Sequence, residues 1–288
     1  KRDILIRQAK AATILRKREA RNDFWAYCLY HDPKLFAKRL FLKKVADAFT
    51  RVYESYVSGV IRRLAVSMPP RAGKSYISSL FISWMLGHFP EESVMRNCCS
   101  DTLYNKLSYD THDIVRSSRF KEIFPDIQLR GDKQNVHGWS LEAARQVSYF
   151  GAGVGGTVIG FGASMLAMTD DLYKSLEDAL SDTNNEKVWS WKQGTHDSRI
   201  EGNCCSNDIR SRRPGRLRTF LVVWRKWGSM TRLSVSPHWM RTIVLSVRMC
   251  IQRSIITNCG RKRTIPSGVP SICRNRSRLL GCCSQNRN

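Results

Sequence analysis

The chain has 288 residues, 42% of them hydrophobic, and a formal net charge of +24 at pH 7. This length suits one large domain or two ordinary ones, and this hydrophobic fraction excludes a disordered chain. No apolar run is long enough to span a membrane, so we expect no membrane partner. The first residues also lack the charged-then-apolar pattern of a signal peptide, which predicts a cytoplasmic location with reduced cysteines.

The charge is distributed unevenly along the chain. Residues 1–200 contain 30 Lys and Arg and 22 Asp and Glu, whereas residues 201–288 contain 18 and 2. The first part therefore has the composition of an ordinary soluble domain, and the second part is compositionally different. The ten cysteines form no CxxC pair, so zinc binding is not expected.

Helical patterns precede residue 60. Residues 1–23 combine Ile, Leu and Ala with many Lys and Arg, which predicts a basic amphipathic helix. Such a helix either packs on the domain as a solvated element or contacts DNA or a partner. Residues 35–57 have apolar side chains on one helical face and predict a second helix. We therefore assign residues 1–60 to an N-terminal helical segment.

Residues 61–203 alternate between strand patterns and helix patterns. Short apolar runs predict strands at 64–68, 93–100, within 135–150 and at 165–169. Helices are predicted between and after these strands, up to 86, at 102–119 and at 172–191. This alternation is typical of an α/β domain with a parallel sheet.

The loop after the first of these strands ends in Gly73, Lys74 and Ser75, and a helix follows. Strand, turn, Gly-Lys-Ser and helix is the order of a phosphate-binding loop, or P-loop. In such a loop the backbone N–H groups wrap the phosphates of ATP, the Lys reaches the β and γ phosphates, and the Ser binds Mg²⁺. Met68 stands where the full pattern has its first Gly. The alternative is an ordinary helix N-terminus with an exposed Lys.

Two acidic residues follow the last predicted strand of this domain. A P-loop enzyme needs an acid at the end of a neighbouring buried strand to hold Mg²⁺, and often a second acid to position water. Asp170 and Asp171 directly follow the apolar run 165–169. They could instead cap the next helix. The order of the two half-motifs favours a nucleotide site.

Together these segments resemble the ATPase half of the terminase large subunit of tailed phages and prophages. That family often has a PPRxGKS-type loop, a GVGG segment, a Gly-x-Gly-Ala turn leading to an apolar strand and Asp-Asp, and then a Lys, a helix and a Trp-rich stretch ending near an Arg. The similar residues here are Met68–Ser75, Gly153–Gly156, Gly160–Ala163, Met165–Asp171, Lys174, Trp189, Trp191 and Arg199. The resemblance covers about residues 24–203.

The resemblance implies an ATPase of RecA-like fold and gives roles to individual residues. Lys74 and Ser75 would bind the phosphates of ATP, and Ser75 and Asp170 would hold Mg²⁺. Asp171 would orient the attacking water, where many relatives have Glu. Arg71 would sense the γ phosphate. Phe161 stands where relatives often have Arg or Lys, which removes a possible phosphate or DNA contact.

For the whole molecule, the resemblance implies a motor that pumps double-stranded DNA into a capsid. It also implies a ring homo-oligomer, with a portal protein and a terminase small subunit as partners. The motor would be in the host cytoplasm and transiently at the procapsid portal. The alternatives are a P-loop kinase for a nucleotide or small molecule, and a non-enzymatic nucleic-acid-binding protein in which the Gly-Lys-Ser is accidental. The long helical segment before the loop argues against a kinase.

Residues 204–288 do not continue the family pattern. The family would have a Thr-Arg-Trp-like coupling motif and then a nuclease domain with metal-binding Asp residues, but no Asp or Glu follows Asp208. With a usual acidic fraction of about 12%, such a stretch has a probability on the order of 10⁻⁵ to 10⁻⁴. We interpret 204–288 as an out-of-frame tail after a frameshift near residue 204, without a predictable fold. The alternative is a basic arm that coats DNA phosphates.

Overall fold

The computed structural model describes residues 2–135, 138–156, 158, 160–211 and 231–234. Residues 212–230 and 235–288, which make up most of the predicted out-of-frame tail, lie outside the described residues. In the described part of the chain, no helix is long and apolar enough to cross a membrane.

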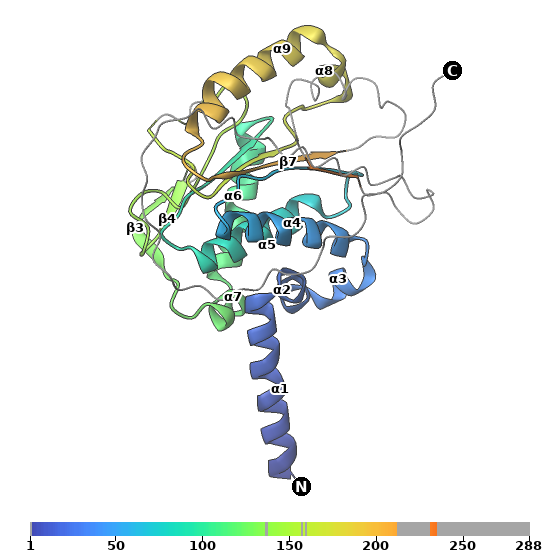
Figure 1. The fold of residues 1–288 in the computed structure, drawn as a ribbon, viewed down its shortest axis with the longest axis vertical. Coiled ribbons are helices and arrows are strands. Elements are labelled where there is room, and N and C mark those ends of the chain that lie inside the picture. Colours follow the sequence, from blue (N-terminus) through green and yellow to red (C-terminus); the bar gives the residue numbers. More distant parts are fainter. Residues whose placement is uncertain (1, 136–137, 157, 159, 212–230, 235–288) are drawn as a thin grey trace, which may run out of the picture. The chain divides into compact units, whose positions relative to one another are not determined.

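The chain begins with helices α1 (Arg2–Asn22), α2 (Phe24–His31), α3 (Pro33–Lys38) and α4 (Leu42–Val57) (Figure 1). The predicted helical segment is thus helical, but it is divided more finely than the apolar pattern indicated. Asp23 and Asp32 explain the divisions, because each carboxylate accepts a hydrogen bond from the first turn of a new helix. The distances are 2.7 Å to the nitrogen of Ala26 and 3.0 Å to the nitrogen of Leu35.

Aromatic side chains join these helices to α5 (Lys74–His88). Phe49 of α4 stacks on Phe81 of α5, with ring centroids 4.5 Å apart, and Phe24 of α2 packs edge-on against Phe81 at 5.2 Å. All three rings are fully buried. Aromatic pairs of this kind contribute about 0.5–1.5 kcal/mol each beyond the area they bury. The N-terminal helices therefore support the helix that begins at Lys74.

The strands that the structure describes form one sheet in the order β3-β4-β5-β2-β6-β7-β1-β8. Their bounds are β1 (Arg63–Met68), β2 (Val94–Cys98), β3 (Leu129–Asn135), β4 (Gly138–Leu141), β5 (Tyr149–Phe150), β6 (Leu166–Asp170), β7 (Cys205–Ser211) and β8 (Thr231–Ser234). Neighbours from β5 to β8 are parallel, and β3 and β4 add an antiparallel edge. The predicted α/β class with a mostly parallel sheet is confirmed.

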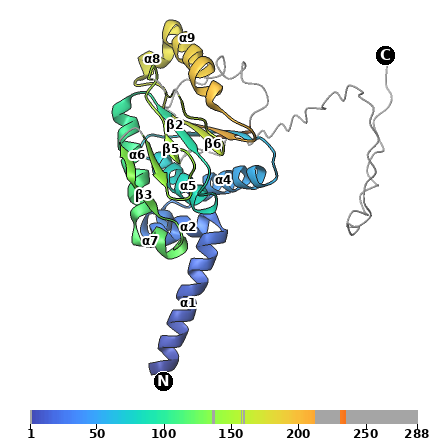
Figure 2. The ribbon, with the colours of Figure 1, turned by 90° about the vertical axis from the view of Figure 1, so that its left-hand side faces the viewer.

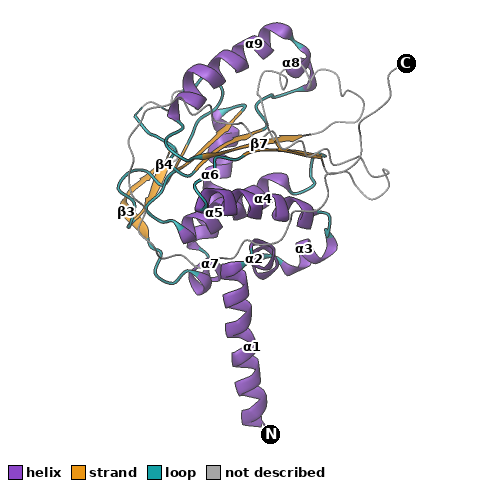
Figure 3. Ribbon diagram, in the orientation of Figure 1, coloured by secondary structure: helices purple, strands orange, loops and turns teal. Residues whose placement is uncertain are grey.

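Helices cover both faces of this sheet (Figures 1 and 3). One face packs against α4, α5 and α6 (Asp101–Arg116), next to the short α7 (Ser118–Ile123). The other face lies toward α8 (Leu176–Leu180), α9 (Asp182–Trp191), the π-helical turn η1 (Lys192–His196) and the 3₁₀ turn η2 (Asp197–Arg199). Figure 2 shows β2, β5 and β6 side by side between these layers. Because the strands are parallel, the loops that follow β1, β2 and β6 meet at one edge of the sheet.

The sheet continues past the boundary that the sequence predicted at residue 203. Strand β7 lies between β6 and β1, and β8 pairs with β1 on its other side, so the prediction of a tail without a predictable fold after residue 204 was wrong for Cys205–Ser211 and Thr231–Ser234. Backbone pairing holds β7 on both sides, whatever its side chains. The strand was not predicted because its side chains do not form an apolar run: Asn207 and Asp208 are polar and yet buried.

Candidate functional site

The loop between β1 and α5 has an unusual backbone. Met68 is buried at the end of β1, and helix α5 begins at Lys74 with Gly73 as its N-cap. Arg71 and Gly73 adopt left-handed conformations, with φ of 61° and 95°. Glycine takes this conformation freely, whereas Arg71 is strained, and strain of this kind costs about 1–3 kcal/mol and is concentrated at functional sites. The loop presents the unpaired N–H groups of the first turn of α5, which favour an anion.

An arginine from the N-terminal helical segment holds this loop in place. Arg39, at the end of α3, donates a hydrogen bond from Nη1 to the carbonyl oxygen of Arg71 at 3.1 Å. A Cβ added to Gly73 would lie 3.4 Å from that same Nη1 and 3.6 Å from Leu42. The side chain of the predicted Arg71 is exposed. Arg39 was not a predicted site residue, since nothing local to its sequence connects it to residue 71.

The structure brings the predicted lysine and the predicted acids together. Lys74 Nζ forms an ion pair with Asp171 and lies 3.9 Å from Oδ1 of Asp170. The side chain of Asp170 is 1% exposed and that of Asp171 is 23% exposed. Asp171 is also left-handed, with φ of 49°, and its backbone N–H donates to Ile209 of β7 at 3.0 Å. The predicted Ser75 follows Lys74 in the same turn of α5.

A buried arginine on β2 joins the same cluster. Arg96 Nη2 donates to Oδ2 of Asp170 at 2.6 Å and to the carbonyl oxygen of Ser75 at 3.2 Å, and Nη1 donates to Ser79 at 2.8 Å. Arg96 was not a predicted site residue, and the sequence analysis included it only as part of the predicted strand 93–100. The available signal was an arginine inside an apolar run, which implies a buried partner of opposite charge.

The glycine-rich segment after β5, residues 151–162, begins at one end of the parallel strands and finishes at the opposite end. Gly153 donates its N–H to Oδ1 of Asp101 at 2.7 Å, and a Cβ there would be 2.5 Å from the backbone nitrogen of Asp101. This part passes close to the carboxyl end of β2, near the lysine and the acids. By contrast, the carbonyl of Gly162 accepts a hydrogen bond from Ser93, which precedes β2. Phe161 packs beside Phe150 at 5.4 Å, so it lies at the far end from Lys74.

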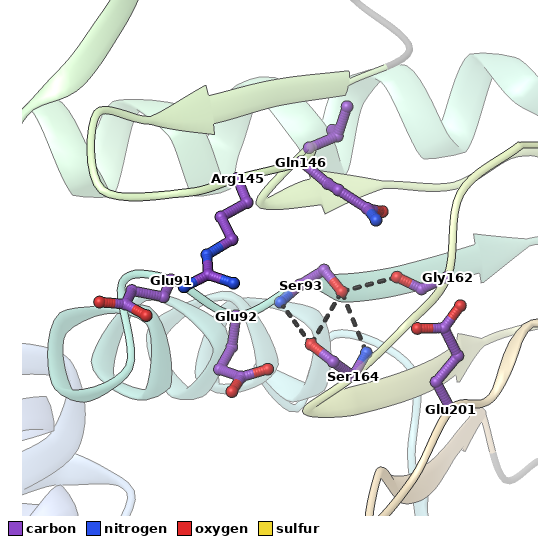
Figure 4. Close-up of a pocket in the computed structure, with 9 residues that line it drawn as sticks. Glu91, Glu92, Ser93, Arg145, Gln146, Gly162, Ser164 and Glu201 are labelled. Carbon is purple, nitrogen blue, oxygen red and sulfur yellow. Dashed lines mark hydrogen bonds between the residues drawn. The ribbon is translucent and has the colours of Figure 1, made fainter.

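A pocket of about 300 Å³ opens at that far end (Figure 4). Its charged lining residues are Glu91, Glu92, Glu201 and Arg145. Ser93 and Ser164 form its floor, with their hydroxyl oxygens 3.0 Å apart. Three carboxylates repel phosphate groups, so this pocket is electrostatically unsuited to the phosphates of a nucleotide.

Polar side chains also link strand ends to the turn η1 on the other face of the sheet. Nδ1 of His196 is 2.9 Å from Oδ1 of Asn97, and Nδ2 of Asn97 donates to the carbonyl of Ala152 at 3.1 Å. Thr169, immediately before the acids, donates to Asp208 at 2.6 Å. Burial lowers the pKa of His196 well below its usual value, so this histidine is neutral. The network fixes the strand ends that carry Asp170 and Asp171.

The donor set near Lys74 suits a hard cation with few protein ligands. Within the described residues, no group of three or more His, Cys, Asp or Glu could surround a metal ion. Asp170 does have one buried oxygen, Oδ1, without a hydrogen-bond partner, and the Ser75 hydroxyl is in the adjacent turn. Mg²⁺ is bound in this way, by one or two protein oxygens together with phosphate and water.

The chain matches no protein-family model, and no curated protein matches it.

Proposed function

We propose that the chain is the ATPase part of a terminase-type motor, which hydrolyses ATP with Mg²⁺ and moves double-stranded DNA. The observation that carries the proposal is the ion pair of Lys74 with Asp171, with Asp170 alongside, at the N-terminus of α5. These residues come from segments far apart in the sequence. In a nucleotide site, a phosphate-binding lysine and a metal-binding carboxylate must lie close together in this way.

Each residue has a role that its position supports. Lys74 exchanges its contact with Asp171 for the β and γ phosphates, and the N–H groups of the first turn of α5 bind phosphate oxygens. Ser75 and Oδ1 of Asp170 would hold Mg²⁺, and the metal would supply positive charge against the charge that develops on the phosphates. Asp171, released from Lys74, orients the water. Arg71 provides a positive charge at the open side of the loop.

The fold and the partners belong to the same proposal. A mostly parallel sheet with a strand between β1 and β6 is compatible with a RecA-like P-loop ATPase. Double-stranded DNA, a portal protein, a terminase small subunit, a ring of copies and a cytoplasmic location at the procapsid follow from the sequence resemblance alone.

The frameshift near residue 204 is part of the proposal as well. Strand β7 has the backbone pairing of a central strand, but both side-chain amide atoms of its buried Asn207 lack hydrogen-bond partners. Translating the DNA across codons 195–215 in all three frames tests this point. We expect another frame to encode a Thr-Arg-Trp-like motif and an Asp-containing nuclease region. A DNA sequence with no other open frame would make the basic segment a genuine arm.

Nucleotide binding by the Lys74→Ala chain is the decisive experiment. A fluorescent ATP analogue should bind the unaltered chain, and the substitution should weaken binding by at least about tenfold, because a charged hydrogen bond to phosphate is lost. Lys106→Ala is the control, since it removes an equal charge from an exposed pair with Asp110. Equal binding by both variants would make the Gly-Lys-Ser accidental. Transfer of the γ phosphate to an added acceptor, rather than to water, would indicate a kinase instead.

A further inference from the structure

Arg96 is a charged side chain enclosed completely by the protein. It lies on β2 between β5 and β6, and it is 0% exposed. Burial alone would lower the pKa of Arg96, but Tyr149 and Asp170 more than offset this effect and raise it, so the guanidinium is charged. A buried charge of this kind is retained only where partners compensate it.

The partners of Arg96 come from two elements of the site. Its guanidinium bonds to Asp170 at the end of β6, and to Ser75 and Ser79 in the first turns of α5. The Ser75 contact is made to the backbone carbonyl, so Arg96 touches the residue that directly follows Lys74. One rigid group thereby sets the distance between the acid and the phosphate-facing helix.

Arg96 also makes the two oxygens of Asp170 different. Oδ2 accepts the short hydrogen bond from Arg96 at 2.6 Å. Oδ1 is buried without a hydrogen-bond partner and lies 3.9 Å from Lys74 Nζ. The carboxylate therefore has one oxygen engaged inside the protein and one oxygen directed toward the phosphate side.

We infer that Arg96 is a positioning residue that holds Asp170 by Oδ2 so that Oδ1 is available to Mg²⁺. The inference rests on the proposed nucleotide site, and it names a residue outside both sequence motifs. Arginine suits this role because its planar fork reaches several acceptors at once, whereas lysine offers a single point charge. Residues that orient a metal ligand typically change metal affinity by about 10–100-fold when they are replaced.

The test is the Mg²⁺ dependence of nucleotide binding by the full chain. A fluorescent ATP analogue is titrated at a series of free Mg²⁺ concentrations and in excess EDTA. Arg96→Lys should raise the half-saturating Mg²⁺ concentration about tenfold or more, and should leave binding in EDTA within about twofold. A merely structural arginine would alter both measurements alike.

Ser79→Ala gives the same answer with a smaller change, should the Arg96→Lys chain not fold. It removes one acceptor of Arg96 and should raise the Mg²⁺ requirement about threefold. Its matched control is Ser78→Ala, a neighbouring buried hydroxyl that bonds to the carbonyl of Lys74 instead. In an Asp170→Asn background, Arg96→Lys should have no further effect on the Mg²⁺ requirement, because Arg96 acts through that carboxylate.

The outcomes separate the two proposals. An unchanged Mg²⁺ requirement in both Arg96→Lys and Ser79→Ala overturns the role of Arg96, even while Lys74→Ala still weakens nucleotide binding. A chain that binds no nucleotide at all overturns the proposed function, and with it the role of Arg96.

Discussion

His31 shows how burial sets a charge state in this protein. Its ring is 4.4 Å from that of Tyr27, and burial, together with the positive charge of Arg119, lowers its pKa to about 4. The unfolded chain takes up this proton near pH 6.5, whereas the folded chain does so only near pH 4. The unfolded state therefore binds more protons between these values. The stability that His31 confers is complete above pH 6.5 and decreases as the pH falls toward 4.

The predicted size of this effect is about 2 kcal/mol at pH 5. Urea unfolding at pH 7 and pH 5 measures it in the unaltered chain and in His31→Phe, which keeps an aromatic ring beside Tyr27. The free energy of unfolding should fall about 2 kcal/mol less in the variant. His196, also buried with a lowered pKa, affects both chains alike. Equal losses in both would mean that His31 titrates in the same way in the folded and unfolded chain.

Residues were predictable where their partners are close in sequence or belong to a short motif. Lys74 and Ser75 follow a strand directly, and the pair Asp170 and Asp171 ends another, so local order alone placed them in one site. The bond of Arg96 to Asp170 spans 74 positions. No pattern within a single strand contains that information, because an arginine in a strand is stabilised only by a partner on a neighbouring element.

The same distinction applies to whole elements, and β7 is the clearest case. Strands β1 and β6 are apolar runs, and periodicity identified both. Strand β7 has Asn207 and Asp208 at fully buried positions, where a central parallel strand usually has Val or Ile. Its place in the sheet comes from backbone hydrogen bonds to β6 and β1, which depend on the fold and leave no mark in the sequence.

A buried polar side chain at a position that usually holds Val or Ile predicts that Asn207→Val stabilises the protein. The amide nitrogen and oxygen of Asn207 are buried without partners, so replacing them removes a desolvation cost without losing a hydrogen bond. A β-branched residue also suits the strand conformation. Thermal and urea unfolding should show a gain of about 1–2 kcal/mol.

Asp208→Val is the contrasting variant in the same strand. Asp208 accepts a hydrogen bond from Thr169, so this substitution leaves a buried hydroxyl unpaired and should destabilise the protein. If Asn207→Val also destabilises, then Asn207 has a function in the strand, and β7 is adapted to its position rather than a product of a shifted frame.

At the scale of the whole molecule, the dominant feature is the concentration of positive charge at one end of the sequence. Residues 241–288 contain ten Lys and Arg and no Asp or Glu. Phosphate contacts release counterions from DNA, so each contact steepens the salt dependence of binding by about 0.9 in log–log slope. This contribution depends on charge alone, so we expect it whether the segment arose by a frameshift or by selection.

Deleting residues 241–288 should therefore weaken binding to double-stranded DNA at low salt and flatten its salt dependence. Fluorescence anisotropy at several salt concentrations measures both. The proposed nucleotide site lies within residues 71–171, so nucleotide binding should stay unchanged, and it serves as the check that the shortened chain is folded. An unchanged salt slope would mean that the ten charges do not reach DNA. If added DNA still stimulates ATP hydrolysis by the shortened chain, residues 1–240 are sufficient for that stimulation. The electrostatic contact of residues 241–288 with DNA is then not required for it.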